Sequence, residues 1–199
     1  KETYTTSGPR ILLWFDAING NIEHHMGSEI DATVSPKFIV KVAGSLKQKP
    51  GCPDYASQAL SNDELEKICN SECYNPTNER RIIQRVEVIK ITPQSYEGES
   101  IGELISDTWK TFECGSTVCS FEFIDEEFTT AQRDSIYYVR AIEEPIKTIA
   151  SDPLGCEYDE NGNCIKTKIC RLGHKKHNEC LAPSEHRAWS SPIFVNYSS

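Results

Sequence analysis

Seven short runs of β-branched and aromatic residues recur along the chain and constrain its fold more than any other feature. They are Ile11–Phe15, Lys37–Ala43, Arg85–Ile91, Thr108–Phe112, Ser120–Phe123, Ser135–Ile142 and Arg187–Tyr197. Most alternate with a period of two, which is typical of strands that turn one face to a core. Between the last two runs lies a polar insertion of more than forty residues that holds four cysteines. We predict a mainly β protein, an antiparallel immunoglobulin-like β-sandwich with disulfide-stapled loops and a short helical insertion.

The length of the chain suits a single domain. At 199 residues it can bury a sizeable hydrophobic core, and its sequence contains no internal repeat or flexible linker. We expect one β-sandwich over residues 1–199, with insertions at about 49–79 and 152–183. Because the chain opens on Lys1 rather than on methionine, we interpret it as a fragment of a longer protein or as a processed product.

The first insertion contains the clearest helix signal. Ser61 followed by Glu64 is a capping-box pattern, and Leu65 and Ile68 add an apolar stripe. These features predict a short helix over about 62–73.

The charge of the chain excludes two classes of partner. The formal net charge is −9, and the lysines and arginines are scattered among more numerous acids. Nucleic acids are therefore not expected as partners, because binding to phosphates needs clustered basic residues. No stretch approaches the ~20 consecutive apolar residues of a membrane-spanning helix, so no membrane span is predicted.

Nine cysteines are the second strong constraint. They are Cys52, Cys69, Cys73, Cys114, Cys119, Cys156, Cys164, Cys170 and Cys180. Such a density without a redox Cys-x-x-Cys motif favours disulfides, and with them a periplasmic or secreted location.

The spacing of the cysteines restricts how they can pair. Cys114 and Cys119 flank four residues, so a hairpin there would bring their sulfurs within bonding distance. Cys69 and Cys73 are one helical turn apart, and we expect one of them to reach Cys52 while the other stays free or pairs elsewhere. The last four cysteines are expected to form two bridges, for which three connectivities remain open.

Two clusters also permit a metal interpretation. Cys170, His174, His177 and Cys180 supply the ligand types of a structural zinc site, but their spacing fits no finger, two lysines lie between the histidines, and we favour disulfides. Asp159, Asn161 and Asn163 alternate around Gly162 as the first ligands of a calcium loop do. The downstream glutamate of such a loop is missing, so we favour a tight turn at Asn161–Gly162.

The sequence predicts no catalytic residues. It contains no Gly-x-Ser-x-Gly nucleophile motif. His24 and His25 follow Glu23, but neighbouring side chains of a strand point in opposite directions and cannot address one site, so we interpret this stretch as an exposed loop. Aromatic residues, Trp14 and Tyr137 among them, are expected in the core.

Parts of the chain resemble a known family. The opening, Lys1–Ile11, is similar to the junction at which bacterial proteins of the PHP (polymerase and histidinol phosphatase) superfamily pass from a metal-binding barrel into a C-terminal β-rich domain. Phe128–Pro145 and Cys180–Val195 resemble the C-terminal region of a large uncharacterised bacterial family of PHP-like metal-dependent hydrolases. Gly155–Cys164 fits the cysteine-bearing version of that family. These segments cover about a third of the chain and lie in the family's order.

The resemblance implies an accessory domain rather than an enzyme. In such parents, the histidine and acidic ligands of the barrel hold two or three divalent metal ions that activate water for attack on a phosphoester. Those ligands precede the junction, so the resemblance implies no cofactor and no metal in this chain, and it makes the missing N-terminal barrel the natural partner. Thr6, Ser7 and Arg10 would lie nearest that barrel, where Arg10 would either face a substrate anion or anchor the first strand.

A self-standing secreted binding module is the competing interpretation, with the cysteine-stapled loops as its recognition surface. The two interpretations differ in what they expect of the surface. An accessory domain should expose an apolar patch near Tyr4 and the first strand, whereas an independent binder should have a formed pocket among its loops. The oligomeric state is open in both.

Overall fold

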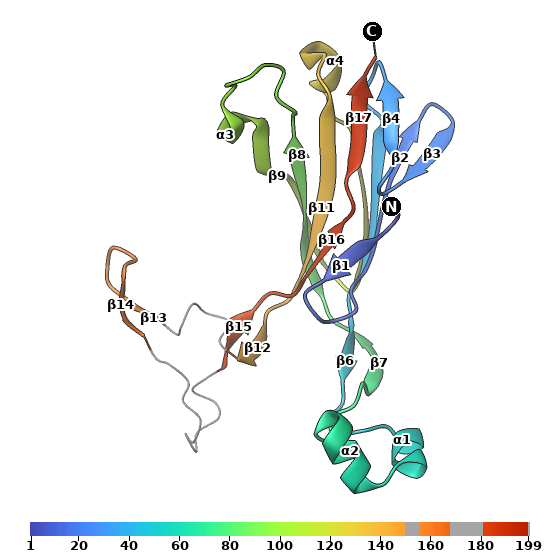
Figure 1. Ribbon diagram of the computed structural model, residues 1–199, viewed down its shortest axis with the longest axis vertical. Coiled ribbons are helices and arrows are strands. Elements are labelled where there is room, and N and C mark those ends of the chain that lie inside the picture. The colour runs from blue at the N-terminus through green and yellow to red at the C-terminus, as the bar shows by residue number, and fades with distance from the viewer. Residues whose placement is uncertain (150–155, 168–180, 199) are drawn as a thin grey trace.

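A computed structural model gives the fold of residues 1–149, 156–167 and 181–198 (Figure 1). Two β-sheets enclose one hydrophobic core, as the strand pattern predicts. The larger sheet consists of β1 (Tyr4–Thr6), β4 (Glu29–Ala32), β8 (Ile83–Ile91), β9 (Ile105–Ser116), β11 (Ser135–Glu143), β16 (Arg187–Ser190) and β17 (Ile193–Tyr197). The smaller sheet consists of β2 (Leu12–Asn19), β3 (Ile22–His25), β5 (Lys37–Ala43) and β10 (Val118–Phe123). The protein is a mainly antiparallel β-sandwich.

The central strand of the larger sheet is β11, which pairs with β8 on one side and with β16 and β17 on the other. The run expected as one strand over 187–197 is two strands, because Pro192 has no backbone N–H and interrupts the ladder. Ser191 instead donates to the carbonyl of Thr3, and Pro192 accepts from Gly27. The final run thereby pairs with both β1 and β4, and its pairing with β4 is parallel.

Period-two alternation places aromatic rings between the two sheets. Phe15, Phe38 and Phe123 extend from the smaller sheet, and Tyr137 extends from the larger. The ring centroids of Phe38 and Tyr137 are 4.6 Å apart, so the sheets are in direct contact. Tyr137 lies in the core as predicted, whereas Trp14 does not. The Trp14 side chain is 47% exposed, because its strand neighbours fill the inward positions and leave it on the outer face.

The first insertion extends from one end of the sandwich as a two-stranded ribbon that carries two helices (Figure 1). We call this end of the sandwich the base. Its elements are β6 (Leu46–Gln48), α1 (Asp54–Ala59), α2 (Asn62–Cys69) and β7 (Pro76–Arg80). The capping box between Ser61 and Glu64 is present. However, α2 ends at Cys69 rather than near Cys73, because Asn70 adopts the left-handed conformation with φ 48° and stops the helix.

The second insertion also leaves the base. It contains β12 (Ile146–Ile149), which pairs with β15 (Leu181–Ser184), and β13 (Cys156–Tyr158), which pairs with β14 (Cys164–Thr167). Two short helices, α3 (Ile101–Leu104) and α4 (Phe128–Ala131), lie at the opposite end of the larger sheet (Figure 1).

The turn between β13 and β14 resembles the predicted one. Gly162 has a φ of 81°, a value that favours glycine. The Asp159 carboxylate accepts hydrogen bonds from the backbone N–H groups of Asn161 and Asn163 at 2.9 and 2.8 Å. These bonds hold the pKa of Asp159 below its usual range. The carboxylate therefore stabilises the turn itself.

The connection between β9 and β10 differs from the expected hairpin. Cys114 and Cys119 are bonded, with their Cα atoms 6.1 Å apart. Yet β9 pairs with β8 in the larger sheet and β10 pairs with β5 in the smaller one. The chain crosses between sheets at Thr117, because β9 still pairs with β8 at Ser116 and β10 begins at Val118. Gly115, whose φ is 64°, lies just before this crossing. The disulfide consequently ties the two sheets together at an edge of the sandwich.

A buried polar group contributes to the contact between the sheets. The hydroxyl of Tyr137 donates to Asp125 at 2.6 Å, and Lys90 forms an ion pair with the same carboxylate. Asp125 is 1% exposed, so each of these partners offsets the cost of burying its charge. Burial and the bond to Asp125 raise the pKa of Tyr137 above its ordinary value of 10.0.

Tyr137→Phe should therefore lower the free energy of unfolding by about 1–3 kcal/mol, because Asp125 loses a donor in a site closed to water. Tyr55→Phe is the matched control, since Tyr55 is 71% exposed, and it should change stability by less than about 0.5 kcal/mol. Urea unfolding followed by circular dichroism measures both. Equal losses in the two variants would contradict the assignment.

The same pair of variants tests how the free energy of unfolding changes at alkaline pH. Because the folded state favours the neutral phenol, the stability due to Tyr137 should be present below pH 10 and decrease as the pH rises beyond it. The free energy of unfolding of Tyr137→Phe should decline less steeply over that range than that of the Tyr55→Phe control.

Candidate functional site

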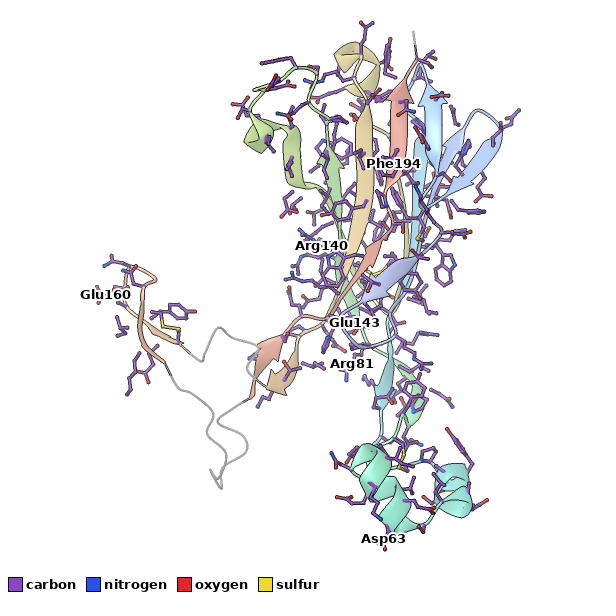
Figure 2. All side chains as sticks on the ribbon, viewed as in Figure 1. Asp63, Arg81, Arg140, Glu143, Glu160 and Phe194 are labelled. Carbon is purple, nitrogen blue, oxygen red and sulfur yellow. A yellow bond between two sulfur atoms is a disulfide. The ribbon has the colours of Figure 1, made fainter. Side chains whose placement is uncertain are left out.

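A pocket lies at the base, where the N-terminal segment meets the roots of both insertions. Its volume is about 300 Å³, and we call it the base pocket. Its walls consist of Gly8, Pro9, Arg10, Ser45, Leu46, Gln48, Tyr74, Arg81 and Ile146. Figure 2 shows Arg81 and Glu143 close together at this end of the sandwich, above the ribbon that carries α1 and α2.

The local backbone explains why the pocket forms here. Gly44 approaches the carbonyl of Arg81 so closely that an added Cβ would lie 1.9 Å from the oxygen, so no larger residue fits without a shift. One residue later, the N–H of Arg81 donates to the carbonyl of Ser45 at 2.8 Å. This close crossing of two chain segments sets Arg81 beside Ser45 and Leu46 in the pocket wall.

Two guanidinium groups in the pocket have no acidic partner among the described residues. Arg10 stacks over the ring of Tyr74, 4.5 Å from its centroid. Arg81 is partly exposed, and within the part of the chain that the structure describes no carboxylate lies within ion-pair distance of either arginine. By contrast, the structure pairs Arg85, Arg133, Arg140 and Arg187 with carboxylates.

Two acidic side chains at the end of β11, Glu143 and Glu144, are bound by neutral donors. Glu143 is fully buried, and its two carboxylate oxygens accept hydrogen bonds from the N–H and the hydroxyl of Ser45. Glu144 accepts from the N–H of Ile82 at 3.3 Å. Among the described residues, no carboxylate therefore occupies the guanidinium donors of Arg10 and Arg81. Arginine is suited to binding an external anion, because its planar group can bind a carboxylate or a phosphate through two parallel hydrogen bonds.

The three residues expected to face a neighbouring barrel have different surroundings. Thr6 ends β1 and lies opposite Ala188. The Ser7 hydroxyl accepts from the N–H of Arg187 at 2.9 Å and lies 3.1 Å from His186 Nδ1, so it anchors the first strand. Of the three, Arg10 is the one that lines the base pocket. A role for them against a barrel remains a prediction.

Sequence reasoning missed Arg81, Tyr74 and Gln48. No periodicity brings them together, since Gln48 and Tyr74 come from opposite ends of the first insertion. The one available sequence signal was the pair Arg80–Arg81 directly before a strand run. Consecutive side chains in an extended segment point in opposite directions, so the two arginines should have different surroundings. Arg80 donates to the carbonyl of Gly44 at 2.6 Å, and Arg81 takes the pocket side.

Three cysteines of the first insertion form a cluster. Cys73 is bonded to Cys52, and Cys69 is a free thiol whose sulfur lies 3.2 Å from that of Cys73. In the second insertion Cys156 is bonded to Cys164. Cys170 and Cys180, with the zinc alternative at His174 and His177, lie outside the described residues. Three disulfides are consistent with an extracellular or secreted protein.

A second polar cluster lies on the hairpin of β2 and β3. The stretch that contains His24 and His25 is a strand rather than the expected loop, because it completes a ladder with β2. The two imidazoles point to opposite faces, as expected for neighbours in a strand. However, Glu23 and His25 share a face, and the Nδ1 atom of His25 lies 2.8 Å from a carboxylate oxygen of Asp16.

Comparisons of the chain with protein-family models, with curated proteins and with solved structures find no match. Across residues 1–149, 156–167 and 181–198, none of the helices combines the length and the apolar character that crossing a bilayer requires.

Peptide mapping without reduction checks the sulfur assignments. The mass spectra should contain the linked pairs Cys52–Cys73, Cys114–Cys119 and Cys156–Cys164, and iodoacetamide should label Cys69 because it is the free thiol of its cluster. Cys69→Ser should abolish the label on the α2 peptide and leave the link between Cys52 and Cys73 intact. A peptide that links Cys52 to Cys69 would overturn the assignment.

Proposed function

We propose that this protein is a non-catalytic binding module that takes up an anionic group, a carboxylate or a phosphate, in the base pocket. The observation that carries this proposal is the pair of guanidinium groups, Arg10 and Arg81, that line one pocket without a carboxylate partner among the described residues. The chain as a whole has a net charge of −9, so two cations that have no acidic partner among the described residues and line one concave site are a specific local feature.

The walls of the pocket indicate what the anionic group is attached to. Leu46, Ile146 and the ring of Tyr74 give apolar surface beside the arginines. A volume of about 300 Å³ is at the small end of the range for ligand sites. A compact ligand or a protruding side chain with a planar or apolar body and one anionic end satisfies both the walls and the charge.

The scaffold suits a binding role in an oxidising environment. The pocket is formed by loops and strand ends on a rigid sandwich, which is where recognition residues are common. Near the first strand, the Tyr4 side chain is 40% exposed, but its β1 neighbours are threonines, so β1 offers little apolar surface for a docked domain. Together with the formed pocket, this favours a periplasmic or secreted binding module.

A second candidate is the C-terminal accessory domain of a periplasmic PHP-like metal-dependent hydrolase. The observation in its favour is that Gly8, Pro9 and Arg10, which belong to the segment that resembles the barrel junction, line the base pocket. In this case the pocket would lie beside the barrel, and the domain would brace the barrel or shape access to its phosphoester substrate. The divalent metal ions would belong to the barrel.

Two probes with one aromatic body and different anionic ends test the binding role. Benzoate or phenyl phosphate should bind the wild-type protein, and Arg81→Gln and Arg10→Gln should each raise Kd by about 10-fold or more, since a charge-assisted hydrogen bond contributes about 1.5–3 kcal/mol. Isothermal titration calorimetry measures the change. Lys37→Gln, which removes an exposed lysine from β5, is the matched charge control and should leave Kd unchanged.

The outcomes separate the candidates. Tighter binding of phenyl phosphate than of benzoate would support the phosphoesterase-associated role, and the reverse order would support a binder of carboxylates. If neither probe binds, or if Lys37→Gln weakens binding as much as Arg81→Gln does, the base pocket is not an anion site.

A further inference from the structure

A second hollow lies on the outer face of the smaller sheet and runs from Ala43 and Val118, at the end nearest the base, to Asp16. It is a groove of about 590 Å³, and its walls include Trp14, Asp16, Lys41, Val118 and Ser120. Trp14 and Val118 are 47% and 61% exposed, so the groove combines apolar surface with a nearly buried carboxylate. Neither the base pocket nor the proposed function accounts for this surface.

At one side of the groove, strand register assembles three side chains with metal-ligand atoms. Asp16 of β2 lies directly opposite His25 of β3, and Glu23 precedes His25 by two residues on the same face. One potential ligand atom from each residue lies within 4.8 Å of those of the other two. The antiparallel ladder fixes this spacing, so the cluster does not depend on flexible loops.

The electrostatic surroundings of this cluster favour a cation. The side chain of Asp16 is 11% exposed, and the described structure gives it no lysine or arginine partner. The carboxylates of Asp16, Glu2 and Glu23 all act on His25 and raise its pKa above 6.5, with the hydrogen bond to Asp16 as the largest cause. Lys41, on the neighbouring strand, is the one lysine or arginine among the described residues of the groove.

We propose that Asp16, Glu23 and His25 form a binding site for a divalent first-row transition metal ion, with Zn²⁺ as the best fit. One imidazole nitrogen and two carboxylate oxygens are ligands that zinc accepts, whereas calcium and magnesium prefer oxygen alone. His25 Nδ1 and the Asp16 oxygen are 2.8 Å apart, and ligand atoms on a tetrahedral zinc lie about 3.3 Å apart, so a shift of about 0.5 Å would seat both on one ion. The ion would replace the proton that these two atoms share.

The proposal has two physical consequences. Three protein ligands leave zinc at least one open position, which water or a small donor in the Trp14 groove can occupy. Binding also releases the shared proton, so affinity should decrease as the pH falls and His25 becomes fully protonated. The charged groups that act on His25 in this equilibrium are Asp16, Glu2 and Glu23, and Lys41 lines the same groove as Asp16.

The histidine pair supplies a matched experiment. His24 precedes His25 but points to the opposite face of β3, so His24→Gln removes an imidazole without touching the cluster. Zn²⁺ is titrated into the full chain while the ring ¹⁵N resonances of His25 are followed by NMR. This readout belongs to one residue and is insensitive to zinc bound at Cys69 or elsewhere.

Saturable shifts of the His25 ring are expected, with Kd raised at least 10-fold by Glu23→Gln and by Asp16→Asn and unchanged by His24→Gln. Glu23 is exposed, so Glu23→Gln keeps the test valid if Asp16→Asn folds poorly. If millimolar Zn²⁺ leaves the His25 ring unshifted, or if Glu23→Gln binds as tightly as the wild-type protein, the cluster is an ion pair only and the proposal fails.

Discussion

The packing of Phe38 against Tyr137, which joins the two sheets across the core, is the contact on which the rest of the structure depends. It sets the distance between β5 and β11, and these strands lead directly into the base of the sandwich. Ser45 follows β5, and Glu143 ends β11. The hydrogen bonds from Ser45 to Glu143 therefore extend the contact between sheets to the point where the insertions leave. A change in sheet spacing would separate these groups and, with them, the walls of the base pocket.

The two sites that we propose use the same scaffold in different ways. The base pocket is made of segments that leave the sheets, so its guanidinium groups are held by stacking and by a close backbone crossing at Gly44. The cluster of Asp16, Glu23 and His25 lies within a sheet, where the ladder itself fixes the spacing. The first arrangement suits a ligand that inserts between loops, and the second suits an ion that needs rigid donors.

The sequence predicted the strands well because period-two alternation is a local property that burial on one face imposes. It also predicted the start of α2, where the Ser61 capping box acts within one turn. It was wrong about the hairpin at Cys114 and Cys119, because their spacing allows a disulfide whether the flanking strands pair with each other or cross between sheets. It was wrong about Trp14 because a large aromatic residue fits either face of a strand, and only the partner sheet decides which face is buried.

Local order and sulfur chemistry were thus readable from the chain alone: a β-rich body, a capped helix in the first insertion, and cysteines spaced for disulfides. Only the tertiary structure brought Arg10 to Arg81, and Cys73 rather than Cys69 to Cys52. The physical reason is the distance along the sequence over which each interaction acts. Strand periodicity and helix capping depend on neighbours a few residues apart, whereas a pocket or a choice of partner depends on how distant segments meet, and that is set by the packing of the whole core.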